Sequence, residues 1–304
     1  MKRAVSISLG SSERDKKVEV ELLGECVSVE RRGTDGDIAK ATALFTELDG
    51  QVDALGVGGI DLWVKMDDKT WNISAAHKLI QGVKQTPVVD GSGLKNTLEA
   101  QAAQTLVAEL GAGYAQGRAL LTAAIDRYGM TKSFVAQGYE IVFGDLMFAL
   151  GIPIPIRSFS TFKVVARLLA APATKLPISV LYPTGDKQDM IIPKFTKWYA
   201  WATVIGGDCH YIKRHMPDDL RGKVIVTNTT TPKDMQMFKE RGVTHVLTTT
   251  PVLDGRSFGT NMMEAALTAV SGKNRPLTDA ELSEMLTELK LKPTVHNLEE
   301  LKTA

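Results

Sequence analysis

Short runs of β-branched and apolar residues alternate with helix-like segments along most of this 304-residue sequence. Alternation of this kind is typical of repeated strand–helix–strand units, in which parallel strands form a sheet and helices cover it. Val52–Val57 and Lys223–Val226 are two such runs, and each stops at a glycine or a threonine. The pattern therefore predicts an α/β protein with mainly parallel sheets.

Start and stop residues mark several of the expected helices. The helix predicted over Pro232–Arg241 has Thr231 before it and Gly242 after it. A hairpin is predicted for Lys17–Leu23 and Cys26–Arg32, which alternate polar and apolar residues. Capping boxes, in which a polar residue and an acid three positions later bond to the helix backbone, are expected at Asn96/Glu99, Asn261/Glu264 and Thr278/Glu281.

The glycine-rich segment Gly111–Gly117 separates two parts that each look complete, and we find no internal repeat. We therefore expect an N-terminal α/β domain over residues 1–115, which would hold the substrate. A Rossmann-like, doubly wound domain with a mainly parallel sheet would follow over residues 116–275, and a C-terminal helix and tail over 276–304. Residues 181–201, rich in proline, glycine and aromatic residues, are expected to form a lid or an interdomain excursion.

Charge and hydropathy exclude several classes of partner. The 36 basic and 35 acidic residues nearly cancel, so general electrostatic attraction to nucleic acid is not expected. The longest stretch without charged residues, Gly242–Leu253, is too short to span a membrane. The N-terminus lacks a signal-peptide core, and Cys26 and Cys209 lie far apart without a metal-site spacing. We expect a cytoplasmic protein that binds a small molecule and no metal. The sequence leaves open whether it forms homo-oligomers.

The segment from Arg118 to Asp145 has the order strand, tight turn, helix and strand, and it ends in an acid. This is the layout of a dinucleotide-binding half, and Asp145 follows Asp126 at close to the spacing of about 20 residues expected for a ribose-binding acid. No GxGxxG motif is present, so Gly129 and the Arg127 guanidinium are the groups suited to phosphate. Asp126, Arg127, Gly129 and Asp145 are therefore predicted to bind NAD or NADP.

Threonine-rich segments follow two predicted strands, at Thr227–Thr231 and Thr248–Thr250. Ligands of open parallel sheets lie outside the carboxyl ends of strands, so Thr227, Asn228 and Thr229 are assigned to the cofactor. The loop before the helix predicted at Met262 contains Arg256, which we assign to an anionic group of the substrate.

Two glycine-containing strand ends in the first domain carry acid–base groups. Gly56–Asp61 ends one strand, and Asp90 and Lys95 follow another. Glycines permit a close approach of main chain to a ligand, and a Lys–Asp pair can move a proton during hydride transfer. Asp90 and Lys95 are therefore the catalytic candidates, and Asp61 is a candidate for substrate binding.

Four segments, YEIVFGDLMFALGIPIP, LYPTGDKQ, VTNTTTPKDM and TTTPVLDGRSFGTNMMEA, give the chain a family resemblance. The sequence resembles bacterial proteins labelled quinate 5-dehydrogenase, within the quinate/shikimate dehydrogenase-like family. The resemblance implies NAD(P)-linked oxidation of a cyclic hydroxy acid such as quinate or shikimate, with hydride transfer at an interdomain cleft. It also implies a substrate domain followed by a nucleotide domain.

An NAD(P)-dependent oxidoreductase is thus the leading expectation, and two alternatives stay open. One is an S-adenosylmethionine-dependent transferase on the same Rossmann-like fold, in which Asp145 would hold the ribose. The other is a non-catalytic ligand-binding or scaffold protein.

Overall fold

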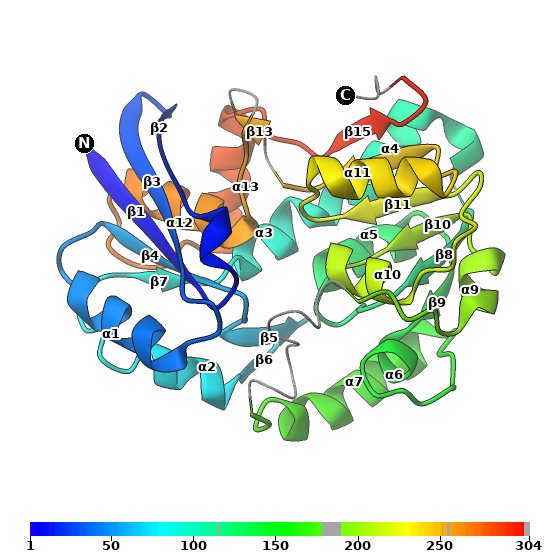
Figure 1. Ribbon diagram of the computed structural model, residues 1–304, viewed down its shortest axis with the longest axis horizontal. Coiled ribbons are helices and arrows are strands. Elements are labelled where there is room, and N and C mark those ends of the chain that lie inside the picture. The colour runs from blue at the N-terminus through cyan, green and yellow to red at the C-terminus, as the bar shows by residue number, and fades with distance from the viewer. Residues whose placement is uncertain (115, 178–189, 251, 254–255, 301–304) are drawn as a thin grey trace. The chain divides into compact units, whose positions relative to one another are not determined.

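The computed structural model describes residues 1–114, 116–177, 190–250, 252–253 and 256–300, with backbone only at 252–253 and 256–257 (Figure 1). The chain divides into two compact units. Unit 1 contains residues 1–97, 168–188 and 252–291, and unit 2 contains residues 98–167, 189–251 and 292–304. Both units combine helices with a mainly parallel sheet, which confirms the expected α/β class.

The main sheet of unit 1 has the strand order β2-β3-β1-β4-β7. All neighbours in it are parallel except β2 and β3, which form the predicted hairpin. Leu23 and Gly24 connect these two strands, both with positive φ, as a tight turn matching the strand twist requires. The strands are β1 (Lys2–Ser8), β2 (Lys16–Leu22), β3 (Glu25–Gly33), β4 (Ala54–Gly58) and β7 (Val88–Val89).

The helices of unit 1 bury their apolar sides on this sheet. Phe45 of α1 packs in one core cluster with Ile7 and Val57 of the strands. Helix α12, orange in Figure 1, lies against β1, β3 and β4. The elements are η1 (Ser12–Arg14), α1 (Ile38–Leu48), the hairpin β5 (Trp63–Met66) and β6 (Lys69–Asn72), α2 (Ser74–Leu79), α3 (Ser92–Thr97), the hairpin β13 (Val252–Leu253) and β14 (Arg256–Ser257), α12 (Thr260–Ser271) and α13 (Asp279–Glu288).

The sheet of unit 2 has the order β15-β12-β11-β10-β8-β9, and only the edge strand β15 runs antiparallel. Its strands are β8 (Arg118–Leu121), β9 (Glu140–Phe143), β10 (Val204–Gly206), β11 (Val224–Thr227), β12 (His245–Thr248) and β15 (Thr294–Asn297). Its helices are η2 (Glu99–Gln101), α4 (Ala102–Leu110), η3 (Ala112–Tyr114), α5 (Tyr128–Ala136), α6 (Asp145–Phe148), α9 (Thr196–Trp201), α10 (Cys209–His215) and α11 (Pro232–Glu240), and α7 (Phe159–Ala173) begins here and ends in unit 1.

The parallel strands of the two units follow one order. In each unit the second parallel strand lies on one side of the first, and the third and fourth lie on the other, as β3-β1-β4-β7 and as β9-β8-β10-β11. The chain thus reverses its direction of travel across the sheet between β1 and β4 and between β8 and β10. In open sheets, ligands bind outside the carboxyl ends of strands at such a reversal.

The units do not follow the predicted domains 1–115, 116–275 and 276–304. Gly111–Gly117 begins within unit 2, because α4 before it packs on α5, with a hydrogen bond of 2.9 Å from Ala103 N to Ser133 Oγ. Residues 252–291 belong to unit 1, because α12 packs on its sheet.

Two of the three expected capping boxes are wrong. Helix α3 ends at Thr97, and Glu99 lies in a short 3-10 turn with its carboxylate turned to an arginine. Helix α12 begins after Gly259 without a side-chain cap, because Asn261 bonds to Ser6 instead. The third box, at the start of α13, is confirmed.

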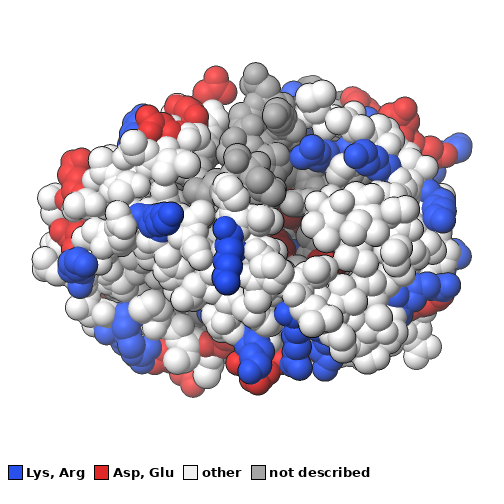
Figure 2. Space-filling view, turned by 90° about the horizontal axis from the view of Figure 1, so that it is seen from below, with Lys and Arg blue, Asp and Glu red and all other residues white. Residues whose placement is uncertain are grey.

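The remaining expectations concern partners and residues 181–201. Within the described residues, no helix is both long and apolar enough to cross a bilayer. On the face shown in Figure 2, basic and acidic side chains are interspersed without a continuous basic region. Of the expected lid, residues 181–189 lie outside the described part of the chain.

The turn between β2 and β3 gives a direct test of backbone strain. Leu23 has φ 53°, a left-handed conformation that costs a leucine about 1–2 kcal/mol, whereas asparagine adopts it readily. Leu23→Asn is therefore expected to raise the free energy of unfolding by about 1 kcal/mol in urea titrations. Leu23→Ala removes the same side chain without favouring this φ, and an equal gain from alanine would contradict the explanation.

Candidate functional site

The segments after β8 and β10 approach closely at the carboxyl edge of unit 2. Gly207 follows β10 with φ 144°, and a side chain there would collide with the hydroxyl of Thr122, which follows β8. The backbone nitrogen of Thr122 also donates to the carbonyl of Gly206. The loops that continue to Arg127 and Asp208 are therefore held together at the point where the strand order reverses.

Arg127 lies in the middle of this edge and is 5% exposed. Its guanidinium contacts three carboxylates: Nη1 lies 2.6 Å from Glu99 Oε1, Nη2 lies 2.7 Å from Asp208 Oδ2, and Nε lies 3.1 Å from Asp126 Oδ2. The contacts with Glu99 and Asp208 are charge-assisted hydrogen bonds, which are strong and directional, whereas Nε and Asp126 form an ion pair. The arginine predicted to hold a phosphate is thus engaged by acids of its own unit.

Asp208 connects the arginine to the next strand end. It caps α10 through the backbone nitrogen of His210 at 2.9 Å and accepts a hydrogen bond of 3.0 Å from Asn228 Nδ2. Burial alone would raise the pKa of Asp208, but the positive charge of Arg127 holds it below its usual value. Asp208 is therefore an ionised carboxylate at neutral pH.

The predicted ribose acid, Asp145, accepts hydrogen bonds from the backbone nitrogens of Ala124 at 3.2 Å and Ile125 at 3.0 Å. Burial raises its pKa to about 6, and the nearby charge of Asp126 adds to the shift. Asp145 thus fixes the turn after β8. Gly129 is buried in the first turn of α5.

The threonine-rich strand ends also reach this edge. Thr227 Oγ1 donates to Asn228 Oδ1 at 3.1 Å, and the same oxygen accepts from the backbone nitrogen of Cys209. Thr229 and Thr250 share a hydrogen bond of 2.6 Å between their hydroxyls, which joins the segments after β11 and β12. The structure therefore gathers the residues predicted at these strand ends around one edge of unit 2.

In unit 1, Lys95 pairs with Asp61. Its Nζ lies 2.8 Å and 2.9 Å from the two carboxylate oxygens. Asp90, the other catalytic candidate, accepts four hydrogen bonds, from the backbone of Leu62, Trp63 and Ser92 and from the Ser92 hydroxyl. Asp90 thus connects the loop after β4 to the loop after β7, and its two oxygens already accept four hydrogen bonds.

The glycines of β4 serve the packing of a helix. A Cβ on Gly56 would lie 2.9 Å from the carbonyl oxygen of Asn261, and one on Gly58 would lie 2.9 Å from Ser8 Cβ. Asn261 Nδ2 donates to Ser6 Oγ at 2.5 Å. The start of α12 therefore occupies the space that the sequence assigns to a ligand.

Sequence reasoning missed Glu264, which we expected only as a helix cap. Its Oε2 accepts hydrogen bonds from the backbone nitrogens of Gly93 at 2.9 Å and Leu94 at 3.3 Å, at the start of α3. Burial and the neighbouring charge of Asp90 raise the pKa of Glu264 to about 8. No local pattern separates this acid from an ordinary cap, because its partners lie far away in sequence.

The side chain of Arg256 lies outside the described residues. In the described part of the chain, no three His, Cys, Asp or Glu residues converge in a way that suits a metal ion.

Glu264 predicts a specific pH dependence of stability. Because its pKa is raised in the folded state, its contribution to stability is complete below the unfolded value of about 4.5 and is lost as the pH rises through about 8. Glu264→Gln keeps the shape and cannot ionise, so its melting temperature relative to the wild type is expected to rise between pH 5 and pH 9. The difference corresponds to roughly 2–4 kcal/mol.

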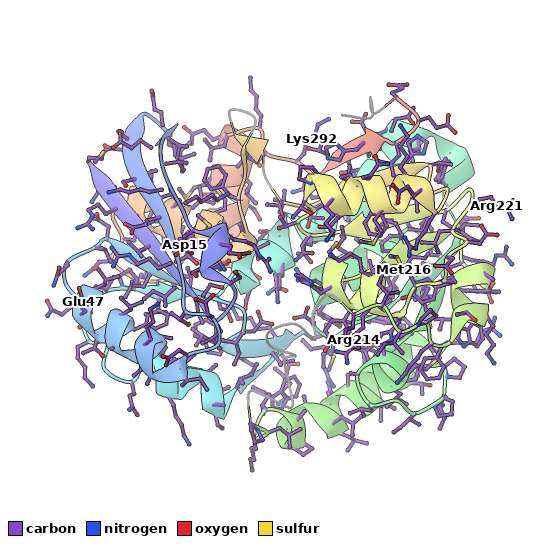
Figure 3. The ribbon with its side chains drawn as sticks, in the orientation of Figure 1. Asp15, Glu47, Arg214, Met216, Arg221 and Lys292 are labelled. Carbon is purple, nitrogen blue, oxygen red and sulfur yellow. The ribbon has the colours of Figure 1, made fainter. Side chains whose placement is uncertain are left out.

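Calorimetric scans across that range test the expectation, with Glu47→Gln on the exposed surface of α1 as the matched control (Figure 3). A parallel pH dependence of the Glu264→Gln variant and the wild type would contradict it.

The ion pairs of Arg127 predict strong coupling. Arg127→Met leaves the fully buried Glu99 without its counter-charge, and about 3–5 kcal/mol of unfolding free energy is expected to be lost. Adding Glu99→Gln is expected to restore much of this loss, because the uncompensated charge is then gone. A double-mutant cycle in denaturant measures the coupling, and additive losses would refute it.

Comparisons with known proteins give a family but no activity. Residues 93–298 match the model of the domain of unknown function DUF8754, and residues 3–90 match that of the domain of unknown function DUF8753. A search of curated proteins found no significant relative.

Solved structures resemble the chain only distantly. AraP, an arabinose-binding protein from Geobacillus stearothermophilus, is 11% identical over 81% of each chain, with a TM-score of 0.38. A periplasmic solute-binding protein of an ABC transporter from Actinobacillus succinogenes, with bound D-allose, is 9% identical over 99% of each chain, with a TM-score of 0.39. GanP, a glucose-galactose-binding protein from Geobacillus stearothermophilus, is 8% identical over 99% of each chain, with a TM-score of 0.39.

These findings overturn the resemblance to quinate 5-dehydrogenases. The matching family models describe no dehydrogenase. The expected NAD(P)-dependent oxidoreductase is therefore wrong, and the physical reason lies in the residues that suggested it. Arg127 and Asp145 bond to their own unit, as described above. Because the DUF8754 model matches about two thirds of the sequence, the chain belongs to the family of the domain of unknown function DUF8754.

Proposed function

We propose that this protein binds a small polar molecule at the carboxyl edge of unit 2 and performs no chemistry on it. The observation that carries the proposal is the set of acids around Arg127 at the reversal of strand order between β8 and β10. Open α/β sheets bind their ligands at this position. We include in the proposal that unit 2 is doubly wound in the Rossmann-like manner, which would form a crevice at this point.

The exposure of the acids indicates which of them would meet a ligand. Glu99 is fully buried, whereas the side chains of Asp126 and Asp208 are 30% and 18% exposed. Partly exposed carboxylates accept hydrogen bonds from hydroxyl or ammonium groups. Asp126 and Asp208 are therefore the proposed ligand-contacting acids, and Glu99 holds Arg127 in place behind them.

Neighbouring side chains add neutral hydrogen-bonding groups. Asn228 and Thr229 follow β11 at this edge, with an amide and a hydroxyl. Burial raises the pKa of Tyr211 to about 12, and the charges of Asp126 and Asp208 contribute, so the phenol is a protonated donor at neutral pH. Together these groups suit a ligand with several hydroxyls or an amine.

The charge of the site argues against an anionic ligand. Three carboxylates surround one guanidinium, so the acids outnumber the base in a partly buried setting. A pyrophosphate there would meet like charges where water screens them poorly. The preference for a neutral or cationic ligand thus follows from the same contacts that remove Arg127 from phosphate binding.

The proposal includes no chemical step, because the residues predicted to move protons are engaged in other contacts. Asp90 accepts four hydrogen bonds that fasten loops of unit 1. Lys95, the other candidate, pairs with Asp61 at 2.8 Å and 2.9 Å. Groups that are engaged in this way support the shape of the protein, and a proton transfer would break these bonds.

A thermal-shift panel tests the proposed function. Its probes are D-ribose and myo-inositol as neutral polyols, putrescine as a diamine, and NAD, NADP and S-adenosylmethionine. We expect protection by a polyol or the diamine and none by the two dinucleotides. Protection by S-adenosylmethionine alone would favour the transferase alternative, and protection by NAD or NADP alone would overturn the proposal.

Substitution then locates the site. Asp126→Asn is expected to weaken binding of the protecting probe about 10-fold or more, because a hydrogen bond to a charged acceptor becomes a neutral one. Asp219→Asn, in an exposed pair with Arg221 elsewhere in unit 2, is the matched control and is expected to leave affinity unchanged (Figure 3). Equal affinities for both variants would place the ligand away from this edge.

A further inference from the structure

The outward side of α7 and the loop that follows α6 carry large apolar side chains. Val164 and Leu168 lie one turn apart on α7, and Leu150, Ile152 and Ile154 lie in the loop. All five are at least 40% exposed. A helix on a protein surface normally presents polar residues to water, and exposed apolar patches mark interaction surfaces. We call these five side chains the apolar surface.

The apolar surface is held in place by contacts of Phe143, at the end of β9. Its backbone nitrogen donates to the carbonyl of Ile156 at 2.8 Å, which anchors the end of the loop. Its ring stacks on Phe162 of α7, with ring centres 4.6 Å apart. Because residues in a helix advance by about 100° each, Val164 and Leu168 point away from the side of Phe162. The packing of α7 on β9 therefore leaves these side chains uncovered.

The chain around the apolar surface is basic. Glu140 of β9 pairs with Arg157 and offsets one positive charge. In the right half of Figure 2, which views the molecule from the side of α7, a broad area without charged side chains is bordered mainly by basic ones. Residues 146–177 contain no Asp, Glu, Asn or Gln, and their charged residues are Arg157, Lys163, Arg167 and Lys175. The partner that suits this composition is apolar and negatively charged.

Tryptophans of α9 lie beside the same basic residues. The guanidinium carbons of Arg157 and Arg118 lie 5.9 Å and 5.7 Å from the ring centre of Trp201, and Trp198 packs edge-on against Trp201. Both tryptophans are partly exposed. Tryptophan combines an apolar ring with a polar N–H and is enriched at the level of lipid head groups. This ring type therefore fits the same partner as the basic residues.

The composition favours a lipid surface over a protein. Protein interfaces depend on directional hydrogen bonds and are depleted in lysine, whereas residues 146–177 have no amide or carboxylate side chain. A two-fold contact with a second copy would place this surface against itself, so that its basic residues would face like charges. A bilayer with anionic lipids requires only apolar depth and a positive charge, and both are present.

We propose that this surface docks the protein on an anionic lipid bilayer. The five side chains of the apolar surface enter the lipid chains, and the neighbouring arginines and lysines meet the head-group phosphates. Docking of this kind occupies one leaflet and requires no membrane-spanning helix. It does not depend on the ligand site proposed at the carboxyl edge of unit 2.

Co-sedimentation of the full-length protein with vesicles tests the proposal. Vesicles of equal parts phosphatidylcholine and phosphatidylglycerol are expected to bind the protein at low salt. Pure phosphatidylcholine vesicles, or molar salt, are expected to weaken binding about 10-fold or more, because each removes the attraction between lipid phosphates and the basic residues.

The double variant Ile154→Ser with Leu168→Ser tests the apolar surface. Its binding to the anionic vesicles is expected to be weaker about 10-fold or more, because two apolar side chains no longer enter the lipid. Both positions are exposed, so an unchanged melting temperature is expected. Ile38→Ser, at an exposed position of α1, is the matched control and is expected to bind as the wild type does.

Three results would each disprove the proposal. The first is no binding to anionic vesicles at low salt, and the second is equal binding by the double variant and the wild type. The third is light scattering that shows a dimer for the wild type and a monomer for the double variant, which would assign the surface to a second copy.

Discussion

The guanidinium of Arg127 is the contact on which the edge of unit 2 depends. It joins a 3-10 turn, the loop after β8 and the start of α10, through Glu99, Asp126 and Asp208. The loop after β8 and the start of α10 lie beyond the ends of strands, and the 3-10 turn follows helix α3. Removing one member of a buried charge set of this kind leaves another without its counter-charge. The geometry of the proposed site therefore depends on Arg127 and on the three acids that contact it.

In unit 1 the loops are fixed by carboxylates that accept hydrogen bonds from backbone nitrogens. Asp90 connects the loops after β4 and β7, and Glu264 holds the start of α3 from a position 171 residues away from Gly93. The two units thus share a strand order but not a way of fixing their loops. The two units therefore share a topology but not the chemistry of their side chains, as expected when function resides in side chains rather than in the fold.

Much of the fold was predictable because its signals are local. The hairpin around Gly24, the helix after Thr231 and the βαβ segment from Arg118 all depend on periodicity and on start and stop residues. The capping boxes at Asn96 and Asn261 failed because the same spacing also occurs where side chains bond to distant partners. A one-dimensional pattern does not distinguish these cases.

The candidate site was predictable in position and not in chemistry. Strand ends at Asp126 and Thr227 follow from the α/β pattern, because carboxyl ends of parallel strands share one edge. The partner of each charge does not follow from it: Lys95 pairs with Asp61, and Arg127 with Glu99. The dehydrogenase prediction was wrong at this step, because it assigned to a cofactor side chains that bond to one another instead.

The path of the chain between units has a consequence for biosynthesis. Helix α12 covers β1, β3 and β4, yet it is made after most of unit 2 has left the ribosome. The N-terminal sheet therefore waits, with one face uncovered, until residues near the end of the chain emerge. Folding during translation cannot proceed one unit at a time, and the exposed strands are a surface that chaperones would have to guard.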